Sequence, residues 1–230
     1  MEPSQSLEQV LHRNKHNFHP VIPENLLESG IHKFDFTANN KDIALIDLSQ
    51  KHAYSHYIEN ELKRHHARTG IGAYNEDRLI YQRSELFGKE KEARSVHLGL
   101  DIWCDSGTPV FTPLDATVHS FKNNHTFGDY GPTIILTHQL GRHVFHTLYG
   151  HLSMESLRDL SVGKKFSKGD HIADFGNYEE NGQWPPHLHF QVVIDMEGYT
   201  GDYPGVCKPA NRDHYLKNCP DPQLILNIDY

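Results

Sequence analysis

Two short histidine motifs are the residues of this 230-residue chain whose types and spacing point to chemistry. HLGLD places His97 four residues before Asp101, and HLH places His187 two residues before His189. Imidazole and carboxylate groups bind transition metals and transfer protons near neutral pH. The motifs therefore predict a metal site or an acid–base site. Neither motif decides the matter alone, because short patterns recur by chance.

A second HxxxD match at 125–129 illustrates this risk. It lies in a Gly/Asn-rich stretch without alternating apolar neighbours, so we interpret it as coincidence.

Both motifs lie on stretches whose alternation predicts a β-strand. Apolar residues occupy every second position of each stretch, namely Val96, Leu98, Leu100 and Ile102 in 96–103, and Leu188, Phe190, Val192 and Ile194 in 187–194. Because successive side chains of a strand point to opposite faces, His97 and Asp101 should share an accessible face. Gly99 leaves room above that strand. His187, His189 and Gln191 should likewise share one face, while the apolar sets turn to a core.

The rest of the chain after about residue 94 is also β-rich. Short alternating runs separated by Gly, Pro, Asn and Asp predict further strands at 109–112, 116–121, 133–138, 143–149, 164–166 and 171–175. The turn 139–142 should join two of them in a hairpin, and Tyr149 and His151 follow at its end.

The first 93 residues have a different sequence pattern, with helical as well as extended segments. The patterns predict a short helix over 6–16, extended pieces at 34–36 and 43–46, and a main helix over 50–67. The apolar positions of this region need a surface to cover, namely Phe34, Phe36, Ile43, Leu45, Tyr54, Ile58 and Leu62. We therefore expect residues 1–93 to pack against the β-rich part as a fixed wall of its groove. A removable plug is the less favoured alternative, because no flexible polar tether is evident.

Composition restricts the partners and the compartment. The net charge of −8 argues against a nucleic-acid partner, and no apolar run approaches the length of a membrane span. Three cysteines without CxxC spacing argue against a disulfide framework. With no basic segment followed by an apolar one at the start, we expect a cytoplasmic protein. Oligomeric state is not predicted.

An ordered set of motifs between about 96 and 195 resembles the lysostaphin-type (M23, LytM-like) zinc metallopeptidases. The matching segments occur in the family's order: His97–Asp101, Gly107–Val110, Ala116–Val118, Tyr130–Gly131, Tyr149–Leu152, Lys168–Asp170 and His187–Phe190. Pro185–Phe190 and Cys219–Pro222 are most similar to cytosolic M23 domains that lack a signal peptide. The lead-in 175–186 departs from the glycine-rich sequence of many cell-wall enzymes, which leaves the substrate open.

The resemblance implies a mainly β fold, in which a folded antiparallel sheet of the M23 peptidase type follows a mixed α/β N-terminal part. It divides the chain into an N-terminal region (1–93), a zinc metallopeptidase domain (94–198) and a C-terminal tail that wraps the domain (199–230).

The resemblance also implies the roles of individual residues. His97, Asp101 and His189 would bind one zinc ion per chain, and His151 and His187 would be catalytic. The implied reaction is hydrolysis of a peptide or muropeptide amide by a zinc-activated water. Tyr130 is interpreted equally well as a polarising group or as a turn residue.

Two other functions remain as alternatives. A zinc-binding M23-like module with a binding or regulatory role would keep the ligands without turnover, but His151 and His187 are intact. A cupin-type metal protein also carries HxH on a strand. Its pattern needs a glutamate a few residues later, and 191–195 contains none.

Overall fold

The computed structural model describes residues 5–28, 30–47, 50, 52–88 and 93–230. The N-terminal region forms α1 (Leu7–Asn14), α2 (Glu24–Glu28), β1 (Ile31–Phe34), α3 (Lys41–Ala44), α4 (Ala53–Arg64), β2 (Thr69–Gly72) and three 3-10 helices in its described part, η1 (Lys15–Asn17), η2 (Leu79–Arg83) and η3 (Glu85–Phe87). The following strands are β3 (Val96–His97), β4 (Leu100–Trp103), β5 (Pro109–Phe111), β6 (Ala116–Asn124), β7 (Gly131–Leu140), β8 (His143–Gly150), β9 (Lys165–Phe166), β10 (His171–Asp174), β11 (His187–Val193) and β12 (Val206–Cys207). Two short helices close the chain, α5 (Arg212–Asn218) and α6 (Gln223–Leu226).

Eight of the strands in the described part of the chain form one sheet, in the order β1-β2-β4-β11-β8-β7-β6-β9. The β1–β2 pair is parallel and the other pairs are antiparallel. The fold is therefore mainly β and mainly antiparallel, as expected. The N-terminal region contributes β1 and β2 to this sheet, and β2 pairs directly with β4.

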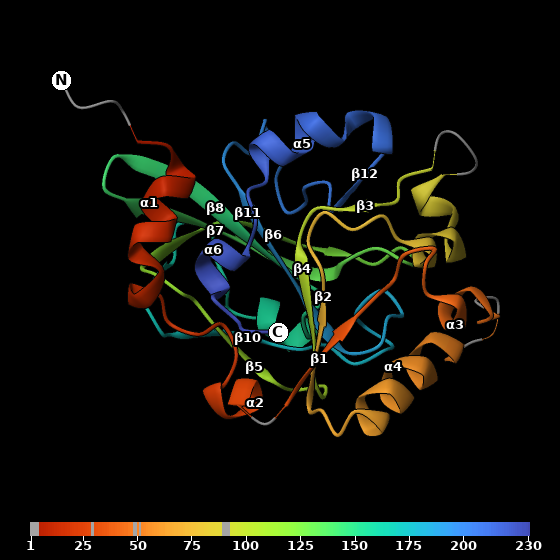
Figure 1. The fold of residues 1–230 in the computed structure, drawn as a ribbon. Helices are drawn as coiled ribbons and strands as arrows, with labels where there is room; N and C mark the ends of the chain where they lie inside the picture. The colour runs from red at the N-terminus through yellow and green to blue at the C-terminus, as the bar shows by residue number, and fades with distance from the viewer. Residues whose placement is uncertain (1–4, 29, 48–49, 51, 89–92) are drawn as a thin grey trace.

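The two faces of the sheet carry different cores. On one face, the apolar side chains of β4 and β11 pack with α1 and α6, through residues such as Leu100, Phe190, Leu11 and Ile225. On the other, Trp103 packs with aromatic residues of the N-terminal region. Figure 1 shows α1 beside α6 and, across β1 and β2, α3 beside α4. The alternation expected for β4 and for most of β11 is confirmed.

Several helices and strands of the N-terminal region begin or end at other residues than the sequence predicted. The helix expected over 6–16 is α1, which begins after Ser6, whose side chain caps it. The main helix is shorter than expected and spans 53–64. The extended piece expected at 43–46 is wrong, because the Asn40 side chain accepts from the backbone N–H groups of Asp42 and Ile43 and starts α3 there. Leu45, expected to cover a surface, is exposed.

The strand expected over 96–103 is two strands. It breaks at Leu98 and Gly99, where β3 pairs with β12 while β4 pairs with β11. Val96 and Leu98 consequently pack in a third core with Ile135 and Cys219, apart from Leu100 and Ile102.

Three smaller differences concern the β-rich part. The hairpin turn consists of Gly141 and Arg142 only, with Gly141 at a φ of 60°. Ile194 lies beyond β11 and is 37% exposed, so it does not extend the core set. Tyr149 packs on Phe190 in the core and does not join His151. The three cysteines are free and buried, and Cys104 lies in the core.

No helix in the described part of the chain is long and apolar enough to cross a membrane.

Candidate functional site

Three ligand-type atoms converge where β3, β4 and β11 meet. Nε2 of His97 lies 3.0 Å from Nδ1 of His189 and 3.2 Å from Oδ1 of Asp101, and the last two atoms are 3.0 Å apart. Ligands about 2.0 Å from a tetrahedral zinc ion stand roughly 3.3 Å from one another. The three atoms therefore form a triangle of the size that one face of a tetrahedral metal site requires.

The hydrogen bonds of the two imidazoles direct their lone pairs into this triangle. Nδ1 of His97 lies 3.0 Å from the Ala73 carbonyl, and Nε2 of His189 lies 2.9 Å from Oε1 of Gln191. The Gln191 amide donates to the Pro204 carbonyl, which turns its oxygen toward His189. Since a carbonyl oxygen only accepts, each ring carries its proton on the outer nitrogen. Two imidazole lone pairs and a carboxylate oxygen thus face one another, an arrangement that a cation stabilises.

The other oxygen of Asp101 is held by a buried arginine. Nη1 of Arg78 donates to Oδ2 of Asp101 at 2.5 Å, and both side chains are almost inaccessible to solvent. Burial alone would raise the pKa of Asp101, but the neighbouring His97 and Arg78 hold it well below the usual value. Asp101 is therefore ionised and presents one oxygen, Oδ1, to the histidines.

Arg78 is itself fixed by the N-terminal region. Its Nε donates to Glu76 at 2.8 Å, its Nη2 donates to the Ala73 carbonyl at 3.0 Å, and its guanidinium packs on the ring of Phe36. The second oxygen of Glu76 accepts from the backbone N–H of Phe36. A continuous set of hydrogen bonds thus joins the segment after β1 to Asp101.

His151 and His187 lie beside the triangle with their rings stacked, at 4.1 Å between centroids. Nδ1 of His151 donates to the Asn181 carbonyl and Nδ1 of His187 to the Pro185 carbonyl, so Nε2 of each ring bears the lone pair. Both carbonyls come from the 175–186 segment. Burial, followed by the neighbouring His187, lowers the pKa of His151 well below its usual value, and burial lowers that of His187 to about 4. Both rings are neutral at pH 7 and able to accept a proton.

The site borders a cavity of about 270 Å³ that both parts of the chain line. His151, His187, His189 and Asp101 line it from the sheet, and Tyr54, Arg78 and Tyr81 from the N-terminal region. The prediction that His97 and Asp101 lie on a solvent-accessible face is wrong. Their exposed fractions are 0% and 4%, because the N-terminal region covers them. Tyr130 also lines the cavity, with its hydroxyl 3.5 Å from Nε2 of His189.

The sequence was compared with models of known protein families. Residues 95–200 match the sequence model of Peptidase family M23.

Residues 95–200 are an M23 peptidase domain.

Two curated relatives are similar to part of this chain. An uncharacterized metalloprotease from Haemophilus influenzae is 35% identical over 136 residues, which is 56% of this chain and 26% of that protein. The peptidoglycan DD-endopeptidase ShyA of Vibrio cholerae is 31% identical over 98 residues, or 43% of this chain and 20% of that protein. The chain therefore spans about a quarter or less of the length of these relatives.

Solved structures of similar chains include M23 peptidases. A zinc-containing peptidase from Vibrio cholerae is 27% identical, with 44% of this chain and 28% of that chain covered and a TM-score of 0.35. The catalytic domain of lysostaphin from Staphylococcus simulans is 25% identical, with 54% of this chain and 81% of that chain covered and a TM-score of 0.37.

Within the M23 domain, the structure brings together the five residues that the sequence suggested as metal ligands or catalytic groups. His97, Asp101 and His189 form the triangle, and His151 and His187 flank it. His125 of the coincidental HxxxD match is exposed, and it belongs to neither of the two possible metal-binding groups found among the described residues.

The surrounding contacts include residues that sequence reasoning missed. Arg78 and the Ala73 carbonyl lie outside the M23 domain, and no local signal marks either of them. Gln191 had a signal, because it stands two residues after His189 on the same face of a strand. The Asn181 and Pro185 carbonyls are backbone groups, so their residue types carry no trace of this role.

Proposed function

We propose that this chain is a zinc-dependent metalloendopeptidase that hydrolyses peptide or peptidoglycan-type amide bonds. The observation that carries the proposal is the 3.0–3.2 Å triangle of His97 Nε2, Asp101 Oδ1 and His189 Nδ1. Two neutral nitrogens and one anionic oxygen are a donor set that suits Zn²⁺, and three protein ligands leave a tetrahedral ion one position for water or substrate. The M23 match and the relatives named as a metalloprotease and a peptidoglycan endopeptidase support the same class of reaction.

Zinc held by these three residues would supply Lewis-acid polarisation of a carbonyl and would lower the pKa of a bound water to about 7. Protein side chains transfer the protons of the reaction. Nε2 of His151 and Nε2 of His187 each present a lone pair, and carbonyl contacts fix the opposite nitrogen of each ring. In this proposal the Nε2 lone pair of one ring takes a proton from the attacking water, and that ring, now charged, donates the proton to the leaving amine. The Nε2 lone pair of the other ring accepts a hydrogen bond from the same water. Burial of both rings keeps them in the base form until reaction.

The test compares metal content with turnover in the full chain. We expect about one tightly held zinc per chain at this site and chelator-sensitive cleavage of a peptide or muropeptide library. His97→Ala, Asp101→Ala and His189→Ala should each abolish tight zinc binding. His151→Ala and His187→Ala should keep the zinc but lower kcat by on the order of 10²-fold or more.

His125→Ala is the matched control, because it removes a histidine of the second HxxxD match and should leave both readouts unchanged. Tight zinc binding by a variant lacking all three ligands would contradict the ligand assignment. Intact zinc binding without cleavage of any peptide or muropeptide would instead favour a binding module, and near-normal activity of the His151 and His187 variants would remove their catalytic role.

A further inference from the structure

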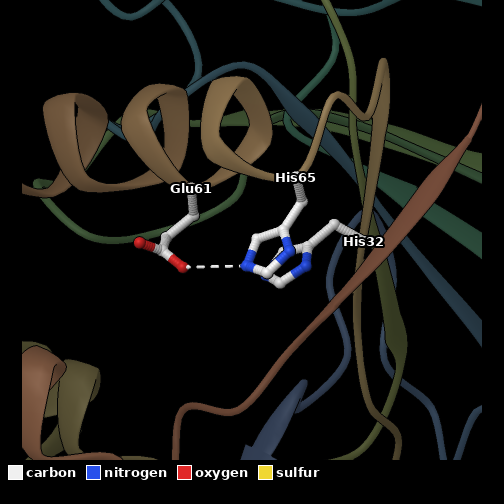
Figure 2. Close-up of side chains that lie close together, drawn as sticks. All are labelled: His32, Glu61 and His65. Carbon is white, nitrogen blue, oxygen red and sulfur yellow. Dashed lines mark ion pairs between the residues drawn. The ribbon is translucent and has the colours of Figure 1, made fainter.

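A second group of metal-ligand side chains lies outside the M23 domain, between β1 and α4. His32 of β1, Glu61 of the last turn of α4 and His65, which directly follows that helix, each offer one ligand atom, and these atoms all lie within 4.8 Å of one another. Figure 2 shows the three side chains pointing toward a common region, two from the helix and one from the neighbouring strand. None of the three contacts the triangle of His97, Asp101 and His189, so this group stands apart from the proposed active centre.

The backbone places the three side chains together without distortion. Glu61 and His65 are four residues apart in sequence, which puts them on one face of α4. His32 lies two residues before Phe34 on the face of β1 that packs toward α4. The cluster therefore follows from how the strand and the helix pack.

The ligand atoms of the three groups lie close enough to share a cation once the stacked rings turn so that both lone pairs meet it. Oε2 of Glu61 lies 3.6 Å from Nε2 of His65, while Arg64 holds the other carboxylate oxygen at 2.8 Å. The imidazoles of His32 and His65 stack with centroids 4.0 Å apart and planes 13° apart. Two protonated rings in this position would repel each other, so at least one ring is neutral and has a lone pair for a metal. Burial followed by the neighbouring His65 lowers the pKa of His32, which agrees with the geometry.

We propose that His32, Glu61 and His65 bind one divalent transition-metal ion, with Zn²⁺ the best match to two imidazoles and a carboxylate. Water fills the remaining positions on the exposed side. Such an ion joins α4 to β1, the edge strand of the main sheet, and so stabilises the packing of the N-terminal region. The proposal does not depend on the proposed peptidase activity.

This site should bind zinc more weakly than the inner triangle. Its ligand atoms are up to 4.8 Å apart and must close toward the roughly 3.3 Å spacing of a tetrahedral site, whereas the inner atoms already stand 3.0–3.2 Å apart. His65 is about half exposed and free to turn, so closure is feasible but costs side-chain entropy. The two sites should therefore fill in order, the inner one first.

The experiment is a zinc titration of the metal-free full chain by calorimetry. We expect two classes of site in the wild-type chain, and loss of the weaker class in the His32→Gln/His65→Gln double variant with the tighter class intact. The chain has 19 histidines, so controls for adventitious binding are needed. His56→Gln, on the exposed side of α4, and His66→Asn, beside the cluster, should each retain both classes. Asparagine is chosen because position 66 has a φ of 52° and asparagine tolerates that conformation.

A second readout on the unaltered chain does not depend on any variant folding. Diethyl pyrocarbonate modification, mapped by peptide mass, should label His32 and His65 in the chain loaded with one zinc equivalent. Two equivalents should protect both residues and leave His66 reactive. The proposal is overturned if the wild-type chain shows no weaker class, if the double variant keeps it, or if zinc protects His66 as well as His32 and His65.

Discussion

At the scale of single residues, the site is determined by where each imidazole carries its proton. Four buried histidines use one nitrogen to donate outward and keep the lone pair of the other for the centre. The outward acceptors are the Ala73, Asn181 and Pro185 carbonyls and the Gln191 side chain. Burial, together with Arg78, lowers the pKa of His97 to about 4. Burial also lowers the pKa values of His151 and His187, so these two rings and His97 are neutral, which is the form that binds metal or accepts protons.

Arg78 provides the most specific prediction at this scale. It is a positioning residue, since it holds Oδ2 of Asp101 and leaves Oδ1 for the metal. Arg78→Met should lower zinc affinity roughly 10- to 100-fold, as loss of an outer hydrogen-bond partner does at other metal sites. It should also destabilise the fold by about 3–5 kcal/mol, because Glu76 and Asp101 lose a buried partner.

Competition with a zinc chelator and thermal unfolding of the metal-free chain measure these two effects separately. Arg78→Lys keeps the positive charge but cannot contact Glu76 and Asp101 at the same time. Its zinc affinity should lie between those of the wild-type chain and Arg78→Met. The exposed Arg158→Ala serves as the control. Unchanged or tighter zinc binding by Arg78→Met would show that the arginine only neutralises charge.

At the scale of elements, the pairing of β4 with β11 builds the centre. In this antiparallel register His189 stands directly opposite Asp101, and His187 stands opposite Trp103. Side chains of directly opposed residues are close neighbours on one face. The break between β3 and β4 is equally important, because it brings His97 over the same point. A continuous strand would carry no such bend, and here Gly99 occupies the bend.

Gly99→Ala tests the importance of that bend. A Cβ at this position would lie 2.5 Å from Cε1 of His189 and 2.8 Å from the Phe190 carbonyl, so the imidazole must move out of the triangle. We expect zinc affinity to fall at least about 10-fold, which chelator competition measures. Gly107→Ala is the control, because it meets open space but strains a φ of 81°. It should lower stability slightly and leave zinc affinity unchanged. Equal zinc affinities in the two variants would contradict this account.

At the scale of the whole molecule, the N-terminal region and the M23 domain are joined through one sheet and one core. β2 pairs with β4, the strand that carries Asp101, and Phe34 and Phe36 pack on Trp103. The same region supplies the Ala73 carbonyl and Arg78 to the site. From these contacts we infer that the N-terminal region is a fixed wall of the groove, and the removable plug is the alternative to be tested.

Removal of the N-terminal region should therefore damage both the fold and the site. The fragment 93–230 loses the strand beside β4 and exposes Trp103, and each lost large aromatic contact costs on the order of 3–5 kcal/mol. We expect it to unfold at a much lower temperature than the full chain, or to lack a cooperative transition, and to bind zinc weakly. Differential scanning calorimetry and zinc titration measure both properties. A stable fragment with raised activity would identify the N-terminal region as a removable plug.

Much of the β-rich part could be predicted from the sequence. The alternation in β4 and β11 separated core residues from site residues, and the helix predicted over 6–16 is found as α1. The ends of helices and strands were predicted less well where a capping side chain or a distant strand, rather than the local hydrophobic pattern, decides the structure. Asn40 starts a helix where an extended piece was expected, and the pairing of β3 with β12 interrupts an apparently continuous strand.

By itself, the sequence determined the mainly β fold and predicted the five histidine and aspartate residues that the structure brings together. Those signals are local, since they depend on alternation along a strand and on motifs a few residues long. Only the tertiary structure decided how deeply the site is buried, that Arg78 orients Asp101, and that His32 meets Glu61 and His65. Each of these features joins segments at least 20 residues apart, and its physical cause is the packing of the N-terminal strands and helix α4 against β4.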